Sequence, residues 1–419
     1  MSIQVSVHED PEVARAVKEL ALEGHEGPGK AGFESIEKYR WLRETGTRLW
    51  LDTGDISAAS NVYSREIEAL TTNNTLVNQV VQTGEMDGVI AYAARKIRAI
   101  RPDISERDLV IEVAFGVNAK LASSLVGKLG AHVSVELHPD TAFDVPQTLT
   151  FARRYHEIDP DFFYIKVPLT PDGFIATRIL AGEGIPINYT LGFSARQNYL
   201  AARFAKPMFV NVFLGRLNSL VEENGLGKPE NVGEKATLAS QEAVRALRAS
   251  YRDIPTSQIA ASMRSGKQIP ALAGVDVFTM PPKAAAEYLE MDVSQADCRP
   301  RKSKELHVEL ADTGLARVTD LTTLWTIDEN AIAFVEDAVK QADEIPSGKQ
   351  LVRLAREHEV DMLREWSADE RAAIRAKGKI PNLSDWPGEP IDGLMSIAAL
   401  ETFAKDQAEL DTRIRGLLG

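Results

Sequence analysis

Polar side chains that could do chemistry stand inside or directly after short apolar runs of this sequence. The most distinctive of them is Lys166, which lies within the apolar run Phe162–Val167. A lysine in such a run either reaches out to water at an edge or is paired and functional. Desolvation makes the neutral amine more available, and a neutral amine attacks a carbonyl carbon to form a Schiff base. Lys166 is therefore the candidate nucleophile.

Two carboxylates occupy comparable positions in other runs. Asp52 directly follows the run Leu49–Leu51, and Glu136 lies within Val133–Leu137. Together with Lys166 they would supply a nucleophile and two acid/base groups. Each carboxylate could instead cap a helix or form an ion pair at the same edge.

Two arginines follow later runs. Arg216 ends the run Met208–Leu214, and Arg264 follows Ser262 at the end of Ile259–Met263. Each could be an ordinary salt-bridge partner, but two arginines on neighbouring strand ends also suit the bidentate binding of a phosphate.

Other candidate residues are weaker. His132 and His138 lie six residues apart and could share a face with Glu136, but no further ligand pattern accompanies them, so no metal site is predicted. The single cysteine, Cys298, has no histidine beside it and is interpreted as structural.

The elements that must position these residues are eight apolar runs, several of them rich in β-branched residues, that alternate with segments of helical period. The runs are Leu49–Leu51, Ile67–Leu70, Val133–Leu137, Phe162–Val167, Ile185–Leu191, Met208–Leu214, Ile259–Met263 and Val275–Met280. Runs of this kind are typical of parallel strands buried on both faces. The pattern predicts an α/β protein with a (β/α)8 TIM barrel, at whose carboxyl-terminal strand ends the polar residues would meet. An open doubly wound sheet is the alternative, although no GxGxxG motif follows the first run.

Helical extensions are expected at both ends of the barrel. We expect an N-terminal helical extension at 1–47, a catalytic barrel at 48–290 and a C-terminal helical extension at 291–419. In the N-terminal extension, Asp10 and Pro11 are residue types that favour the N-cap and the first turn of a helix. The final helix has Phe403, Leu410, Ile414 and Leu417 on one apolar face. The region at about 345–392 has no assignable role and is interpreted as an insertion.

Composition excludes several classes of protein. The 419 residues are 44% hydrophobic and 26% charged, so global disorder is excluded. Lys and Arg total 48 against 61 Asp and Glu, and the resulting net charge of −13 disfavours nucleic acid and anionic membranes as partners. There is no apolar run of about 18 residues, and Met1–Val5 lack a basic start, so neither a membrane span nor a secretory leader is expected. With one cysteine, the chain fits a cytoplasmic location.

The stretches around the candidate residues, taken in the order in which they occur along the chain, resemble the transaldolase family of Schiff-base aldolases. The likeness runs from about Leu49 to Ala286, and residues 403–407 resemble the helix that ends many members. Seven short motifs carry it: Leu51–Ile56, Leu70–Asn73, Val133–Glu136, Tyr164–Pro168, Gly184–Ser194, Phe213–Arg216 and Ser262–Arg264.

The resemblance implies a role for each matched residue. Lys166 would form the Schiff base, and Asp52 would be the general acid/base. Glu136 would assist proton transfer through a water molecule that Thr190 helps to hold. Five further residues would bind the substrate hydroxyls or its phosphate: Asn73, Asn188, Arg216, Ser262 and Arg264. Such an enzyme needs no cofactor and no metal.

Three positions depart from the family pattern. Asn74 and Val212 each replace a usual proline, and Asn211 replaces a usual serine at a substrate-binding position. Glu136 and Phe213 match the residues of transaldolases, whereas the related small fructose-6-phosphate aldolases tend to have Gln and Tyr there.

The resemblance therefore implies transfer of a dihydroxyacetone unit from a ketose phosphate, sedoheptulose 7-phosphate or fructose 6-phosphate, to an aldose phosphate in the pentose phosphate pathway. The alternatives are an aldolase or transferase for another sugar, and a non-catalytic sugar-phosphate binder, against which Lys166, Asp52 and Glu136 together argue. The expected partners are phosphorylated sugars, and a homodimer is allowed.

Overall fold

The strands of this protein close into a barrel that positions the candidate residues. The computed structural model describes residues 6–29 and 32–418, so Met1–Val5, with the expected absence of a leader, lie outside the described residues. All eight strands pair in parallel and in sequence order, with the last beside the first. The strands are β1 (Arg48–Asp52), β2 (Ile67–Thr71), β3 (His132–Glu136), β4 (Phe163–Pro168), β5 (Ile187–Thr190), β6 (Phe209–Phe213), β7 (Ser257–Ala261) and β8 (Val277–Met280). The prediction of a (β/α)8 barrel is confirmed, and the open sheet is excluded.

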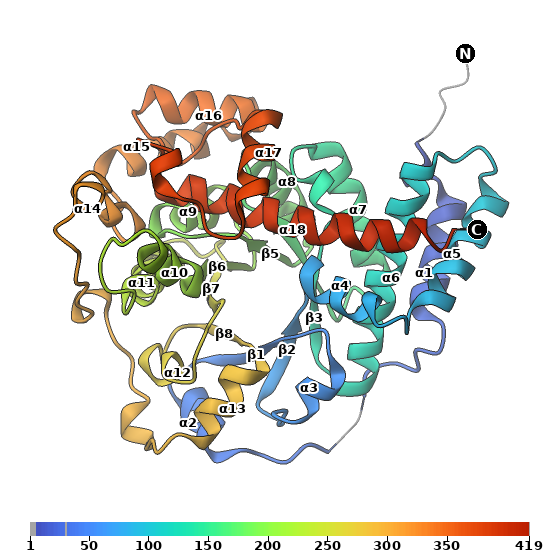
Figure 1. Cartoon of the computed structure of the whole chain (residues 1–419), viewed down its shortest axis with the longest axis horizontal. Coiled ribbons are helices and arrows are strands. Elements are labelled where there is room, and N and C mark those ends of the chain that lie inside the picture. Colours follow the sequence, from blue (N-terminus) through green and yellow to red (C-terminus); the bar gives the residue numbers. More distant parts are fainter. Residues whose placement is uncertain (1–5, 30–31, 419) are drawn as a thin grey trace.

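Helices follow the strands and surround the barrel (Figure 1). Those between β1 and the end of the eighth unit are α3 (Ile56–Ser60), α4 (Asn74–Gln82), α5 (Asp87–Ile100), α6 (Glu106–Leu129), α7 (Val145–Ile158), α8 (Pro171–Gly182), α9 (Ala195–Leu200), α10 (Leu214–Glu223), α11 (Val232–Ser250), α12 (Gln268–Ala271) and α13 (Pro282–Glu290). Short 3-10 or π turns add η2 (Pro139–Thr141) and η3 (Ala201–Ala205).

The N-terminal residues form helices that pack beside the barrel. The described elements before β1 are η1 (Val7–Glu9), α1 (Pro11–Leu22) and α2 (Glu37–Glu44). Asp10 caps α1 by accepting from the backbone N–H groups of Glu12 and Val13, with Pro11 in the first turn, as the sequence predicts. The helix α1 packs on α6 and α5.

The C-terminal residues are helical as expected. Their elements are η4 (Gln295–Asp297), η5 (Ser303–Glu305), α14 (Gly314–Val318), η6 (Leu321–Leu324), α15 (Glu329–Lys340), η7 (Ala342–Glu344), α16 (Gly348–Glu357), α17 (Ala368–Lys377), η8 (Leu383–Asp385) and α18 (Ile391–Arg415). The long helix α18 crosses the molecule from the α15–α17 group to α5 and α6 (Figure 1). The division of the chain at 47/48 and 290/291 remains a prediction.

The inside of the barrel is apolar below the level of the candidate site. Trp50 stacks on Tyr164 with 5.4 Å between ring centroids, and its edge meets Phe209 at 4.7 Å. Successive residues of a strand point to opposite faces, so every second residue points into the barrel. Two positions after Trp50 and Tyr164, the next inward residues of β1 and β4 are therefore Asp52 and Lys166. An aromatic layer therefore closes the barrel directly beneath the layer of polar residues.

One helix is long and apolar enough to cross a membrane by length and composition. In α6, an 18-residue window has a mean hydropathy of 1.6, but 89% of that window is buried inside the protein. Its apolar surface is already covered by neighbouring elements such as α1, α5 and β3. The burial is typical of a core helix.

Candidate active site

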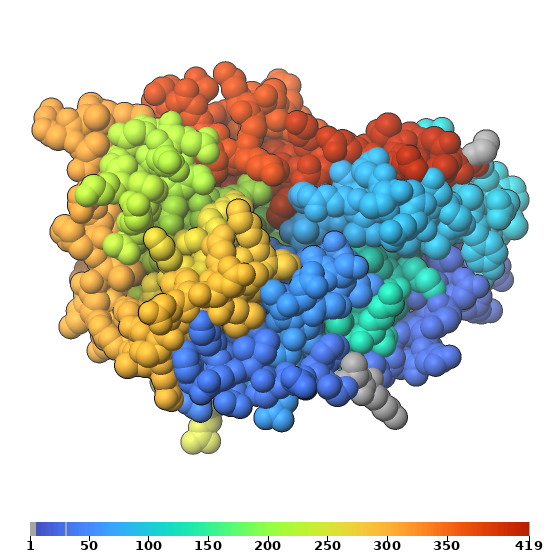
Figure 2. Space-filling view, turned by 60° about the horizontal axis from the view of Figure 1, so that its bottom comes forward, coloured from blue at the N-terminus to red at the C-terminus, as the bar shows by residue number. Residues whose placement is uncertain are grey.

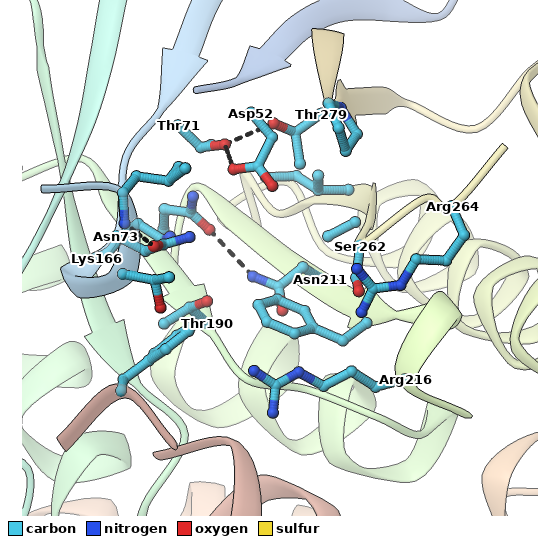
Figure 3. A pocket seen from close by; sticks show the side chains of 18 of the residues that line it. Asp52, Thr71, Asn73, Lys166, Thr190, Asn211, Arg216, Ser262, Arg264 and Thr279 are labelled. Carbon is cyan, nitrogen blue, oxygen red and sulfur yellow. Dashed lines mark hydrogen bonds between the residues drawn. The ribbon is translucent and has the colours of Figure 1, made fainter. Parts of the chain in front are cut away.

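A cavity at the carboxyl-terminal ends of the strands contains almost all the predicted site residues. It encloses about 800 Å³ including its open mouth. Figure 3 shows Lys166, Asn73 and Thr190 on one side and Arg216, Ser262 and Arg264 on the other. The predicted residues that line it are Asp52, Asn73, Lys166, Asn188, Thr190, Asn211, Phe213, Arg216, Ser262 and Arg264. Glu136 is the exception.

Lys166 lies in the middle of a row of polar residues on three neighbouring strands. The register pairs it with Glu136 of β3 on one side and with Asn188 of β5 on the other. Its side chain is only 5% exposed, and its Nζ donates to the Thr72 carbonyl oxygen at 2.9 Å. The lysine is therefore fixed by its neighbours, with its amine buried at the cavity wall.

Glu136 stands behind Lys166 and not at the cavity wall. Its Oε2 is 3.5 Å from Lys166 Nζ, which is an ion-pair distance, although that oxygen has no directed hydrogen bond. Burial raises the pKa of Glu136, while the charge of Lys166 opposes the rise. Its other neighbours, Asn118 and His138, line a second, smaller cavity. Glu136 can act on the reacting atoms only through Lys166 or a water.

Asp52 ends β1 and is held by two threonines. Its Oδ1 accepts from Thr71 Oγ1 at 2.7 Å, and Thr71 Oγ1 is 2.6 Å from Thr279 Oγ1 (Figure 3). Burial raises the pKa of Asp52, and the charges of Lys166 and Arg264 and the Thr71 hydrogen bond partly offset this. A carboxyl group with a raised pKa accepts and returns protons nearer neutral pH than an exposed aspartate does.

Asn73 has a structural role alongside its place in the cavity. It is the N-cap of α4, and its Oδ1 accepts from the Leu76 backbone N–H at 2.9 Å. With that oxygen occupied, the amide Nδ2 is the group left to donate to a ligand. Next to it, Asn74 Nδ2 donates to Gln407 Oε1 at 2.8 Å, so the residue that departs from the family pattern links α4 to α18.

Asn188 and Asn211 are cross-connected on neighbouring strands. Asn188 Nδ2 donates to Ser134 Oγ at 3.0 Å, and Asn211 Nδ2 donates to Asn188 Oδ1 at 3.4 Å and to the Tyr189 carbonyl oxygen at 3.2 Å. Thr190, two residues after Asn188, is buried, and among the described residues its Oγ1 has no hydrogen-bond partner. Thr190 therefore presents a free hydroxyl next to Lys166.

Arg216 and Arg264 come together, and each lies three residues beyond the end of its strand, β6 or β7. Arg216 lies in the first turn of α10, one turn beyond the strand end that the sequence suggests, because β6 stops at Phe213. Gly215 allows the close approach: a Cβ there would stand 2.1 Å from the Ser262 carbonyl oxygen and 2.7 Å from Arg264 Cγ. Ser262 has a φ of +63°, a left-handed conformation that L-residues with a side chain seldom adopt.

The Arg216 guanidinium is buried without a carboxylate. It lies over the Phe403 ring at 5.6 Å and near Thr402 Oγ1 at 3.5 Å, and no described acidic side chain forms an ion pair with it. Burial and the charge of Arg264 lower the pKa of Arg216 to about 10. It is still protonated at neutral pH, and an anion placed between the two arginines would stabilise both.

The helix α18 completes the wall of the cavity. Its first turn is fixed by Asp392, which is fully buried and receives two hydrogen bonds from Arg196, at 2.8 and 2.9 Å. Ser396 Oγ donates to the Leu191 carbonyl oxygen at 2.8 Å. The same helix carries Phe403, whose ring lies against the Arg216 guanidinium. Leu417, expected on that face, lies beyond the end of the helix.

The weaker candidates lie apart from the cavity. His132 stacks on Tyr164 at 4.8 Å, at the start of β3, whereas His138 lies 3.6 Å from Asp411 beyond its end. No group of three or more potential ligands gathers anywhere in residues 6–29 and 32–418. Cys298 is buried with its Sγ 3.3 Å from the Tyr288 hydroxyl oxygen.

Several lining residues were not selected from the sequence. Thr71 ends β2 and Thr279 is the penultimate residue of β8, so the strand-end position that revealed the other candidates could have revealed them too. Lys379, in the region taken as an insertion, also lines the cavity, and no signal in the sequence indicates this. The cavity thus combines a buried lysine, a carboxyl group, amide side chains and a cationic end, which suits covalent chemistry on a carbonyl compound that carries an anion.

Comparison with known proteins gives consistent matches. A family model described as Transaldolase/Fructose-6-phosphate aldolase matches residues 49–345. A transaldolase of Rhizobium etli (strain CFN 42) is 29% identical over 298 residues, covering 70% of this chain and 88% of that protein. A transaldolase of Agrobacterium fabrum (strain C58) is 29% identical over 302 residues, with 68% and 87% covered. A probable transaldolase of Parvibaculum lavamentivorans is 34% identical over 168 residues, with 39% and 67% covered.

Proposed function

Because the chain belongs to the transaldolase/fructose-6-phosphate aldolase family, we propose that it is a transaldolase that moves a dihydroxyacetone unit from a ketose phosphate to an aldose phosphate. One observation carries the proposal. The buried amine of Lys166 opens on a cavity that also holds Asp52 and two cations, Arg216 and Arg264, that form no ion pair with a described acidic side chain. The donors are sedoheptulose 7-phosphate or fructose 6-phosphate, and the reaction belongs to the pentose phosphate pathway in the cytoplasm.

In the first half of the reaction, Lys166 Nζ attacks the ketose carbonyl carbon, and loss of water gives an iminium. Asp52 accepts the proton of the C4 hydroxyl, the C3–C4 bond breaks, and its electron pair moves to the iminium to form an enamine. The shortened aldose phosphate leaves. The iminium is the electron sink, so the residues of the cavity are sufficient for this step.

In the second half, the enamine carbon attacks the carbonyl carbon of an acceptor aldose phosphate. Asp52 returns its proton to the new hydroxyl, and water releases the longer ketose from Lys166. In this proposal, Asn73 Nδ2 and the Asn188–Asn211 pair hold the enamine hydroxyls meanwhile. Glu136, beside Lys166 but behind the wall, and the free hydroxyl of Thr190 would direct the water that carries protons to and from the nitrogen.

The family description also covers aldolases, which release dihydroxyacetone and need no acceptor. Glu136 and Phe213 favour the transferase, because they match transaldolases in the motifs quoted above. Phe213 lines the cavity and meets Phe193 edge to face, with 5.9 Å between ring centroids. An aldolase or a transferase for another sugar is the second candidate.

The direct experiment is a product assay. The protein is incubated with fructose 6-phosphate and erythrose 4-phosphate, and sedoheptulose 7-phosphate and glyceraldehyde 3-phosphate are measured. Formation of both in equal amounts supports the proposal. If neither forms, and other ketose donors also fail, the proposed function is wrong.

Replacing Arg216 with alanine is expected to raise the Michaelis constant for phosphorylated substrates about tenfold or more. A hydrogen bond to a charged partner contributes about 1.5–3 kcal/mol, and each 1.4 kcal/mol is about a factor of ten. We expect a smaller rise for Arg264→Ala, because Arg264 is exposed to solvent. The measurement compares fructose 6-phosphate with unphosphorylated fructose. Equal losses for both donors would show that these arginines support the structure and do not bind phosphate.

A further inference from the structure

The C-terminal extension contributes a lysine to the cationic end of the cavity. Lys379 lies between α17 and η8 and lines the same cavity as Arg216 and Arg264. In Figure 2 the C-terminal residues, in red, lie along the top of the view, next to the light-blue residues of α4 and α5. The extension therefore forms part of the wall around the site.

The segment that carries Lys379 is fixed on both sides. Before it, Arg375 of α17 lies 2.6 Å from Glu401 of α18, whose carboxylate is buried. After it, Asn224 at the end of α10 makes two hydrogen bonds: its Nδ2 donates to the Pro381 carbonyl oxygen at 3.1 Å, and its Oδ1 accepts from the Leu383 backbone N–H at 2.8 Å. Lys379 thus stands on a short span held between α18 and α10.

The chain turns sharply before Lys379. Gly378 ends α17 with a φ of +111°, a conformation that a residue with a side chain rarely adopts. The turn separates two lysines with different surroundings. Lys377 lies 3.4 Å from Asp385, whereas Lys379 forms no ion pair with any described acidic side chain. Its ammonium group is free to meet an anion in the cavity.

Three cations without carboxylate partners therefore line one cavity in a protein of net charge −13. Two acidic side chains that act electrostatically on the arginines accept hydrogen bonds from threonines: Asp52 accepts from Thr71, and Asp406 accepts from Thr75. Repulsion between Arg216 and Arg264 already makes the charged form of Arg216 less favourable. A third positive charge at the same mouth adds to the repulsion, and a bound dianion would relieve it.

We propose that Lys379 is a third cation of the phosphate subsite, supplied by the C-terminal extension, which binds the phosphate of the sugar substrate from the solvent side. The proposal rests on the proposed function, because it assigns Lys379 to the anionic end of the same substrate. Lys379 would increase affinity for phosphorylated over unphosphorylated sugars without taking part in bond breaking. It is a specificity residue that the barrel alone does not contain.

The test compares Lys379→Gln with the matched control Lys377→Gln in the full chain. Binding of inorganic phosphate is measured by calorimetry at low and high salt. We expect Lys379→Gln to weaken phosphate binding about threefold to tenfold at low salt, and by less at high salt, since the lysine is exposed and salt screens it. Lys377→Gln should stay within about twofold of wild type, and Lys379→Arg should restore most of the affinity. Equal phosphate affinity in wild type and Lys379→Gln would overturn the proposal.

Kinetics supply a second readout. Lys379→Gln should raise the Michaelis constant for the phosphorylated donor by a similar factor and leave kcat unchanged, with no change for the unphosphorylated donor. A fall in kcat with unaltered phosphate binding would contradict the assignment. If the wild-type protein turns over no sugar phosphate, the proposed function fails, and the phosphate titration alone still decides whether Lys379 binds the anion.

Discussion

Replacing Lys166 with alanine is expected to abolish turnover, because it removes the buried amine that forms the iminium, and Lys379, the other amine that lines the cavity, is exposed to solvent. Lys166 is the buried amine of the polar layer, held between Glu136 and Asn188 by the register of β3, β4 and β5. Loss of the nucleophile removes the covalent route entirely, so the effect should be larger than that of any other substitution in the site.

The measurement is covalent trapping. Borohydride added with fructose 6-phosphate reduces the iminium to a stable secondary amine, which digestion and mass spectrometry locate. The adduct should fall on Lys166 in the wild type and be absent from Lys166→Ala. Lys96→Ala is the control, because Lys96 lies on α5 and pairs with Glu19 far from the strands. An adduct on a different lysine would contradict the assignment.

Asp52→Asn is expected to lower kcat by about 10²–10⁴-fold, which is the usual contribution of a general acid/base group. The substitution keeps the shape of the side chain, but the amide cannot accept the C4 hydroxyl proton. Trapping on Lys166 should largely persist, because attack on the carbonyl precedes cleavage of the carbon–carbon bond. Near-normal transfer by this variant would remove Asp52 from the mechanism and leave the barrel assignment intact.

The pH dependence provides a check on the same residue. The pKa of Asp52 is raised. On acidification its carboxylate is therefore protonated at a higher pH than that of an exposed aspartate. The acidic limb of kcat/KM should therefore lie at a higher pH than the ordinary pKa of an aspartate, and it should belong jointly to Asp52 and Glu136, whose pKa is also raised. In Asp52→Asn, the part of the limb due to Asp52 should vanish.

Stability distinguishes a chemical effect from misfolding. A carboxyl group whose pKa is higher in the folded than in the unfolded protein contributes stability below its unfolded pKa, and this contribution is lost as the pH rises through the folded value. At pH 7, the raised pKa of Asp52 therefore lowers the free energy of unfolding. The free energy of unfolding of Asp52→Asn at that pH should be no lower than that of wild type, so a loss of activity cannot be attributed to unfolding.

The strands and their polar ends could be predicted from the sequence because a parallel barrel imposes a strong local pattern. Each strand is buried on both faces, so a lysine or aspartate in such a run stands out, as Lys166 and Asp52 do. The carboxyl ends of all eight strands meet at one mouth, which is why residues more than a hundred positions apart could be assigned to one cavity.

The rest depends on contacts that no local pattern encodes. Glu136 stands in a strand of the same kind, yet it lies behind Lys166, since only three-dimensional packing decides which side chain reaches the wall. Arg216 belongs to a helix because β6 ends three residues earlier. Lys379 was missed because its place is set by the Arg375–Glu401 and Asn224 contacts, which join segments far apart in the chain.

The measurement that tests the central claim most directly is the amount of free dihydroxyacetone formed from fructose 6-phosphate with and without erythrose 4-phosphate. A transferase holds the three-carbon unit on Lys166 until an aldehyde arrives. Without the acceptor we predict no more than about one equivalent of dihydroxyacetone per enzyme, and with it many turnovers of transfer to sedoheptulose 7-phosphate. Steady multiple-turnover release of dihydroxyacetone without the acceptor would contradict the transferase and identify an aldolase.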